Sequence, residues 1–384
     1  MVTLKLQHSA PFDSAEAGSF LAAVPAAPAV FALWTQTDPE RSTEPYLGRS
    51  RNLRHRLERL LARPRPRLRR LSLHEFTRRV DYQCVGSSFE AAWLIYQLNR
   101  AHFPRTYRQR LRLKPPALLK VNLANRFPRC YPTTRLRRDG SLYYGPFPSR
   151  AEAERYAGEF LDFFKIRRCV EDLDPDPKHP GCIYSQMRMC LAPCFAGCTD
   201  GEYRQELARS VAFLDTEGTS LVYELESERT RAADALDFEQ AGRLHQRLEK
   251  VNDLRRRRPD LARKITDLHA VIVQRGPDPK SVVFFRVWCG QMQGPASLSL
   301  DEKVASPEPL DEQIQQLLSS LASAAGRASP SESRALPLWE HLAILSRWYY
   351  SSFREGEFLL LKRPDEIPHA RLIRICRKLT QPAG

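Results

Sequence analysis

Five of the nine cysteines lie in one short stretch, and this clustering constrains the fold more than any other feature of the sequence. Four of them follow one another at intervals of thirteen, eight and four residues: Cys169, Cys182, Cys190 and Cys194. Grouped cysteines typically bind a metal, and four thiolates suit either structural zinc or an iron–sulfur cluster. The spacing alone does not separate these two centres. We expect the metal to hold a small domain together.

The chain also carries a large excess of positive charge. Over 384 residues the net charge is +15, and the isoelectric point is about 9.6. Such a surface concentrates phosphate-bearing polyanions, so nucleic acid is the favoured partner. An anionic membrane is the rival partner, but no apolar stretch reaches the length that spans a bilayer. The apolar run Leu21–Trp34 is short, contains two prolines and makes a poor secretory signal, so we expect a cytosolic protein without structural disulfides.

The positive charge is densest between Arg49 and Arg70, where ten arginines accompany one acid, Glu58. The stretch follows two predicted strands, at 29–34 and 45–48, and begins as an amphipathic helix with Ser50 or Asn52 as its cap. A solvated helix face would interleave both signs of charge, and that alternative is the weaker one here. We expect nucleic-acid backbone contacts, since guanidinium groups pair bidentately with phosphate. The candidate residues are Arg49, Arg51, Arg54 and Arg59.

The rest of the chain alternates between strand and helix signals. We expect a strand at 80–85, a serine-capped helix at 87–103 and a hairpin at Asp139-Gly140. Highly charged helical sequence from 200 to 257, broken near 216–220, predicts a helical hairpin. A three-stranded meander at 268–300 and two helices, around 309–325 and 337–353, complete the chain. The serine- and alanine-rich segment 318–334 is expected to be a loop or linker.

The stretch from Ala29 to Arg56 resembles the GIY-YIG nuclease domain of UvrC and Cho, the incision subunits of bacterial nucleotide excision repair. The family pattern G-[VI]-Y, a spacer, then Y-[VI]-G-K-A-x-N-L-x-x-R is matched at Tyr46, Gly48, Asn52, Leu53 and Arg56. In that family the second-motif tyrosine and the arginine ten residues later take part in phosphodiester cleavage. The resemblance therefore implies these roles for Tyr46 and Arg56, beside one divalent ion held by a carboxylate from a later helix.

Two positions depart from this family pattern. Phe31 replaces the first-motif tyrosine, and Ile95 stands where the family has its metal-ligand glutamate. Isoleucine offers no oxygen to a hard cation. Glu90 lies about 140° away around the same helix and faces elsewhere. We therefore expect an impaired nuclease site, with an active endonuclease using Mg²⁺ or Mn²⁺ as the alternative.

The segment "CIYSQMRMCLAPC", residues 182–194, resembles the UvrC/Cho pattern C-L-x-Y-Q-x-x-x-C-x-x-P-C. The resemblance extends over most of 126–194 and implies a [4Fe–4S] cluster on Cys169, Cys182, Cys190 and Cys194. Zinc, within a nucleic-acid module unrelated to repair, remains the alternative. In the same region either Tyr143 or Tyr144 could stack on bases, because one of two neighbouring strand residues must point inward.

Residues 235–251, "ALDFEQAGRLHQRLEKV", resemble the UVR motif, the helical pair through which UvrC-type proteins contact the UvrB helicase. The apolar stripe of this motif gives the candidate partner-binding residues Leu236, Phe238, Ala241, Leu244 and Leu248. The alternative is a plain helical hairpin that packs on its own domain.

These features predict an α+β multidomain protein. We expect an N-terminal extension (1–24), a GIY-YIG-like domain (25–108), a cysteine domain (109–200), a UVR-type hairpin (201–258) and a C-terminal α+β domain (265–384). The last part resembles only the lead-in to the RNase H-like nuclease of UvrC, so we expect no second nuclease. The predicted function is DNA binding in nucleotide excision repair, with double-stranded, damaged DNA and a UvrB-type helicase as partners.

Overall fold

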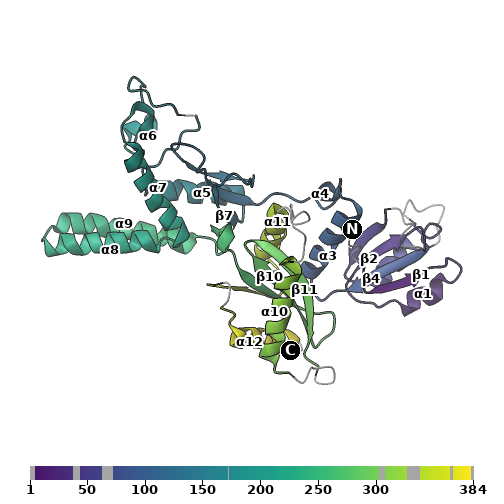
Figure 1. Ribbon diagram of the computed structural model, residues 1–384. Helices are drawn as coiled ribbons and strands as arrows, with labels where there is room; N and C mark the ends of the chain where they lie inside the picture. The colour runs from purple at the N-terminus through teal and green to yellow at the C-terminus, as the bar shows by residue number, and fades with distance from the viewer. Residues whose placement is uncertain are drawn as a thin grey trace.

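The computed structural model describes residues 5–37, 44–62, 72–171, 173–301, 308–326, 338–363 and 366–381. It contains three four-stranded sheets with helices around them, which confirms the expected α+β multidomain fold. Figure 1 shows an elongated molecule, with the N-terminal domain at one end and a long helical hairpin at the other. The C-terminal sheet lies between them.

The N-terminal domain is an antiparallel sheet in the order β1-β4-β2-β3, with helices packed against it. Its elements are β1 (His8–Pro11), α1 (Ala17–Ala23), β2 (Ala29–Trp34), β3 (Tyr46–Ser50), α2 (Leu53–Leu60), β4 (Arg79–Cys84) and α3 (Ser88–His102). Residues 1–24 were expected to be an extension, but β1 pairs with β4 and supplies the edge of the sheet. The sequence does not predict this strand, because its four residues, HSAP, show no alternation of apolar and polar side chains.

Side-chain caps fix where α2 and α3 begin, as their sequences predict. The Asn52 side chain accepts a hydrogen bond from the His55 backbone N–H at 3.0 Å, and the Ser87 hydroxyl accepts one from that of Glu90 at 3.1 Å. The proline- and arginine-rich stretch after α2 lies, from residue 63 to 71, outside the described residues.

The middle domain has a sheet in the order β6-β5-β7-β8, covered by α5 (Arg150–Leu161). Its strands are β5 (Ala117–Val121), β6 (Cys130–Thr133), β7 (Leu142–Phe147) and β8 (Arg263–Lys264). The hairpin expected at Asp139-Gly140 is wrong, because β6 and β7 pair on opposite sides of β5 rather than with each other. Asp139 instead forms an ion pair with buried Lys120 of β5 and accepts the Ser141 backbone N–H. These contacts fix the turn to the central strand.

Three helices, rather than two, follow the cysteines: α7 (Asp200–Asp215), α8 (Thr219–Asp234) and α9 (Phe238–Arg257). The break near 216–220 separates α7 from α8, and the hairpin itself is formed by α8 and α9. Leu244, Leu248 and Val251 of α9 share one apolar core with the middle sheet and α7. One common core therefore spans the expected boundary at residue 200 between the cysteine domain and the helical hairpin.

The C-terminal domain is an antiparallel sheet in the order β11-β10-β9-β12. Its elements are β9 (Ala270–Arg275), β10 (Ser281–Trp288), β11 (Gln291–Ser299), α10 (Leu310–Gly326), α11 (Leu338–Tyr349), β12 (Glu357–Leu360) and α12 (His369–Thr380). The predicted meander is confirmed. The expected loop at 318–334 is wrong up to Gly326, because Ile314, Leu318 and Leu321 bury one face of α10 on the sheet.

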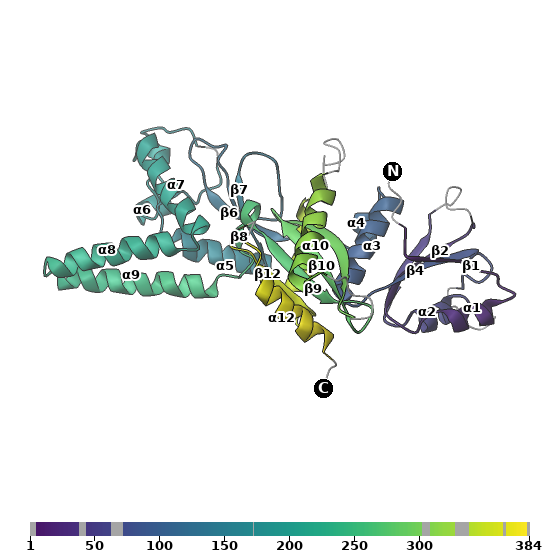
Figure 2. The same ribbon diagram turned by 60° about the horizontal axis from the view of Figure 1, so that its bottom comes forward.

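Helix α3 joins the N-terminal and C-terminal domains and lies between them in both views (Figures 1 and 2). Ala91, Leu94 and Leu98 pack on the N-terminal sheet, whereas Phe89 and Trp93 pack in the core of the C-terminal domain. One face of α3 therefore packs in the N-terminal domain, and another face packs in the C-terminal domain.

A buried carboxylate stabilises the contact between α3 and the C-terminal domain. Glu340 of α11 is fully buried and accepts hydrogen bonds from the Tyr96 hydroxyl at 2.8 Å and the Tyr107 hydroxyl at 2.7 Å. Tyr107 lies in the short helix α4 (Tyr107–Arg110), which follows α3. The neighbouring Arg108 donates its Nε–H to the same carboxylate at 2.6 Å. The contacts join segments more than two hundred residues apart.

Candidate nucleic-acid interface and cysteine centre

Tyr46 and Arg56, which the sequence singled out ten residues apart, meet in the structure. Tyr46 begins β3, the edge strand of the N-terminal sheet, and Arg56 lies one turn into α2. The guanidinium donates from Nη2 to the tyrosine hydroxyl at 3.3 Å. Both side chains are half-buried, so the pair lies at the surface and a phosphate group could reach it.

Phe31 lies beside this pair, on the neighbouring strand. Its ring centroid is 6.3 Å from that of Tyr46, and it is fully buried under α2. Phe31 is paired with Gly48 across β2 and β3, and a Cβ at position 48 would lie only 2.5 Å from the ring. The glycine therefore makes room for the aromatic ring.

Ile95 is not grouped with these residues. It packs with Leu47 in the core between α3 and the sheet, whereas Tyr46 and Phe31 belong to the core on the α2 side. Neighbouring strand residues point to opposite faces, which separates Leu47 from Tyr46. Glu90 is buried at the start of α3, where its carboxylate accepts the Gly86 backbone N–H at 2.9 Å. It thus faces away from Ile95, as the helical spacing predicted.

The candidate phosphate-binding arginines differ in how exposed their side chains are and in whether the protein already binds the guanidinium group. Arg49, Arg51 and Arg59 are exposed. Arg54 is half-buried and donates from Nε to the Val24 carbonyl at 2.8 Å, so part of its guanidinium holds the domain together. Among the described residues, no carboxylate forms an ion pair with these arginines.

The four candidate metal ligands lie in the loop that precedes α7. This loop contains the short helices α6 (Ile183–Gln186) and η1 (Pro193–Phe195). Burial is the main cause that raises the pKa of the Cys190 thiol to about 11; the hydrogen bond from the Ala192 N–H lowers it, and Cys169, Cys182 and Cys194 make smaller raising contributions. The other three thiols thus lie near enough to Cys190 to act on it electrostatically. No three His, Cys, Asp or Glu side chains in the described part of the chain are grouped to bind a metal ion.

Two N–H groups point at the cysteine sulfurs, and they test whether thiolates fit here. The Ala192 backbone N–H donates to Cys190 Sγ at 3.3 Å, and Arg167 lies with Nη1 3.6 Å from Cys169 Sγ. Such donors favour the charged thiolate form that binds metals. These two donors suit thiolates at Cys190 and Cys169, although the four sulfurs are not grouped around one point in this structure.

Arg167 is a residue of this region that the sequence analysis missed. It is almost fully buried, and besides Cys169 it donates to the carbonyls of Phe127 at 3.0 Å and Glu171 at 2.7 Å. Its only signal in the sequence is its place two residues before the first clustered cysteine.

The candidate partner-binding residues fall into two groups. Leu236 and Phe238, at the tip of the hairpin, are 72% and 71% exposed, and Ala241 is half-buried. Leu244 and Leu248 are buried in the core of the middle domain. The apolar stripe is therefore mostly used inside the molecule, and only its tip residues are accessible.

The two tyrosines considered for base stacking are both buried. The Tyr144 hydroxyl donates to Asp215 at 2.7 Å, and the Tyr143 hydroxyl accepts the Arg137 backbone N–H at 3.1 Å. Neither ring is therefore open to stack on a base. Tyr144 packs in the core on one face of the sheet and Tyr143 in the core on the other, so both faces of β7 are covered.

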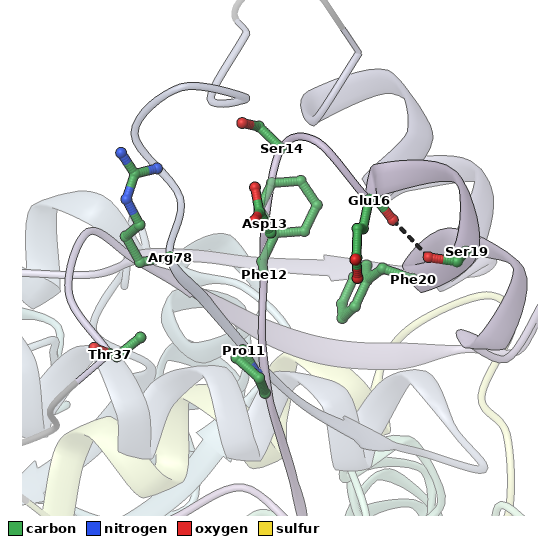
Figure 3. A pocket seen from close by; sticks show the side chains of 9 residues that line it. All are labelled: Pro11, Phe12, Asp13, Ser14, Glu16, Ser19, Phe20, Thr37 and Arg78. Carbon is green, nitrogen blue, oxygen red and sulfur yellow. Dashed lines mark hydrogen bonds between the residues drawn. The ribbon is translucent and has the colours of Figure 1, made fainter.

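A separate hollow lies on the N-terminal domain (Figure 3). Phe12 and Phe20 line it, together with Asp13, Glu16 and Arg78. None of the candidate site residues lines this hollow, so it is not part of the interface above. In the part of the chain that the structure describes, no helix is both long and apolar enough to cross a bilayer.

Two family models match the chain. The model described as "UvrC/Cho excinuclease, middle domain" matches residues 117–213, from β5 to α7, and includes all four clustered cysteines. The model of the "UvrB/uvrC motif" matches residues 219–254, which form the hairpin of α8 and α9. Neither match reaches Tyr46 or Arg56.

Individual relatives carry the name "UvrABC system protein C". The chain is 29% identical to that of Moorella thermoacetica over 62% of its own length and 39% of the relative. It is 30% identical to the Corynebacterium diphtheriae protein (77% and 43%) and 25% identical to that of Methanothermobacter thermautotrophicus (87% and 55%). The chain thus spans about half the length of these relatives or less. No solved structure matches the chain.

Proposed function

We propose that this chain, which is of the UvrC/Cho excinuclease type, binds damaged DNA in nucleotide excision repair and carries an impaired GIY-YIG nuclease site. The observation that supports DNA binding most strongly is the set of exposed arginines beside Tyr46 and Arg56, which have no described carboxylate partners. Arg49, Arg51 and Arg59 would bind phosphates of the backbone bidentately.

Phosphodiester cleavage requires an activated water, a cation at the pentavalent phosphate and a metal that neutralises charge. Arg56 can supply the cation. Phe31 has no hydroxyl, and Ile95 offers no oxygen to a metal ion. Ile95 packs on the other side of the sheet from Tyr46, so the missing hydroxyl of Phe31, which adjoins Tyr46, is the stronger support for binding without efficient cutting.

The alternative is an active endonuclease that uses Mg²⁺ or Mn²⁺ with a UvrB-type partner. The intact Tyr46–Arg56 hydrogen bond favours this alternative. The two are separated by incubating the purified chain with lesion-bearing duplex, Mn²⁺ and a UvrB-type helicase. We expect salt-sensitive binding and no nicking above the level of Arg56→Ala. Robust nicking that disappears in Arg56→Ala would show that the site is active.

We also propose that Cys169, Cys182, Cys190 and Cys194 bind a [4Fe–4S] cluster, which would staple the loop before α7 to the middle domain. The N–H donors at Cys190 and Cys169 support this centre. Four thiolates suit zinc as well as a cluster, and the resemblance of residues 182–194 to the UvrC/Cho pattern favours the cluster.

Metal analysis of anaerobically purified protein tests this assignment. We expect a brown protein with iron and sulfide, and loss of both in Cys190→Ala. Cys198→Ala is the matched control, since this half-buried cysteine lies outside the proposed set and should keep the iron. A colourless, zinc-loaded protein would assign zinc instead.

The hairpin of α8 and α9 is proposed to bind a UvrB-type helicase through its tip. Leu236 and Phe238 are the apolar side chains that remain exposed there. Leu236→Ala/Phe238→Ala should weaken binding of such a partner at least tenfold, as expected for exposed apolar anchors. Tyr223→Ala is the control, because Tyr223 is equally exposed near the other end of the hairpin. Equal affinity of the two variants would contradict the tip as the binding site.

A further inference from the structure

The last helix, α12, has an outer face made of basic residues. Its twelve residues contain Arg371, Arg374, Arg377 and Lys378 and no acid. At 100° per residue these four positions cover about 120° of the helix circumference. Leu372 and Cys376 lie on the opposite side.

The apolar side of α12 is already used in the fold. Leu372 and Cys376 are fully buried in the core that α10 and α12 form on the C-terminal sheet. A helix that binds a membrane surface inserts its apolar face among the lipids. This face of α12 is not accessible, so the basic face is what the helix offers to a partner.

Within the described residues, the arginines of α12 also form none of the ion pairs that other arginines of the chain have. In the hairpin and in α5, exposed arginines pair with carboxylates of the same helix, such as Arg243 with Glu239 and Arg150 with Glu154. Arg371, Arg374 and Arg377 are exposed, and no described carboxylate pairs with them. Lys378 alone in this set has such a partner, Glu357 at 2.7 Å. In this respect α12 is like α2.

We propose that the outer face of α12 is a second binding surface for the sugar–phosphate backbone of double-stranded DNA. The inference rests on the proposed DNA-binding function and extends it to the C-terminal domain, to which that function assigned no role. Figures 1 and 2 both show α12 at the periphery of the molecule, away from the N-terminal domain. The chain would therefore contact one duplex at two separate places, at α2 and at α12.

The test measures the affinity for a labelled duplex by fluorescence anisotropy, at several NaCl concentrations between about 50 and 200 mM. Each phosphate contact contributes about 0.9 to the slope of log K against log salt. The variant Arg371→Ala/Arg374→Ala/Arg377→Ala should lower that slope by about 2 to 3 and the affinity by tenfold or more. Replacing the same three arginines by lysine should retain most of the affinity, which would exclude misfolding as the cause.

A matched control removes the same charge elsewhere. Arg150→Ala/Arg155→Ala/Arg243→Ala replaces three exposed arginines that are held in ion pairs, and it should bind like the unmodified chain. If the α12 variant binds no worse than this control, the proposal is wrong. The proposal is also wrong if the α12 variant loses affinity only for vesicles with anionic lipids or for an acidic peptide.

The variant Arg49→Ala/Arg51→Ala/Arg59→Ala separates this proposal from the proposed function. If it weakens DNA binding while the α12 variant does not, DNA binding stands and the second surface is refuted. If the unmodified chain does not bind duplex DNA, both proposals fail.

Discussion

Gly48 faces Phe31 across two neighbouring strands, and its missing side chain makes the contact possible. A Cβ at this position would lie 2.5 Å from the Phe31 ring, which is buried on both sides. Gly48→Ala should therefore lower the free energy of unfolding of the N-terminal domain by about 1–3 kcal/mol, as overpacking does. Chemical denaturation followed by circular dichroism would measure the change.

The same substitution should have the opposite effect at Gly242. This glycine lies on an exposed face of α9, and a Cβ there would meet nothing within 4 Å. Gly242→Ala should stabilise the hairpin by about 1 kcal/mol, because alanine is the better helix former.

Phe31→Leu combined with Gly48→Ala should recover the stability that Gly48→Ala alone loses. If Gly48→Ala alone is neutral, the contact with Phe31 does not explain the glycine.

Arg167 is the second residue whose role depends on a few precise contacts. Its guanidinium reaches two carbonyls and Cys169 Sγ from a buried position. Arg167→Met leaves these acceptors without a partner, which costs about 1–3 kcal/mol for each buried group. We expect loss of bound metal together with a lower unfolding midpoint, measured by metal analysis and thermal denaturation. Arg168→Met, which removes a pair with largely exposed Asp162, should change stability by about 1 kcal/mol or less.

At the scale of the element, the first turn of α3 contains Glu90, and the burial of this carboxyl group disfavours its ionised form. Desolvation raises the pKa of Glu90 to about 7, despite the hydrogen bond from Gly86 that lowers it. The neutral form is thus favoured in the folded state. The neutral Glu90 side chain makes its full contribution to the free energy of unfolding below the unfolded pKa of 4.5. This contribution is lost as the pH rises through the folded pKa of about 7.

Glu90→Gln keeps the size and an acceptor oxygen without the charge. It should stabilise the protein by up to about 3 kcal/mol near pH 8 and by little near pH 5, measured by thermal unfolding at both pH values. Glu202, at the matching position of α7, is exposed, and hydrogen bonds from Thr199 lower its pKa. Glu202→Gln should therefore destabilise near neutral pH, and less so in acid. The same response to pH in both variants would contradict the burial argument.

The elements that the sequence predicted correctly are those defined by contacts close in the chain. The caps at Asn52 and Ser87 and the apolar spacing after them are enough to predict α2 and α3. The failures at β1 and at Asp139-Gly140 come from pairing between distant segments, His8 with Tyr82 and Lys120 with Asp139. Local propensity contains no information about such pairs.

At the scale of the whole molecule, the same division applies to the candidate site. Tyr46 and Arg56 could be predicted as a pair because both belong to one eleven-residue motif of the family that the sequence resembles. Arg167 could not, since its burial depends on the Phe127 carbonyl forty residues earlier, and the exposure of the α12 arginines depends on how that helix packs on its sheet. Nor does any local pattern place Ile95 on the other side of the sheet from Tyr46.

The contact between the N-terminal and C-terminal domains can be tested through Glu340. Because α3 packs on both the N-terminal and C-terminal sheets, we expect these domains to unfold in one calorimetric transition. Glu340→Ala leaves the buried hydroxyls of Tyr96 and Tyr107 without an acceptor, at about 1–3 kcal/mol each. This contact should then open before either core, so the variant should unfold in two transitions. Glu357→Ala removes only the surface pair with Lys378, worth about 0–1 kcal/mol, and should keep the single transition. A single transition in Glu340→Ala, at the midpoint of this control, would mean that the apolar contacts of Phe89 and Trp93 are sufficient to couple the domains.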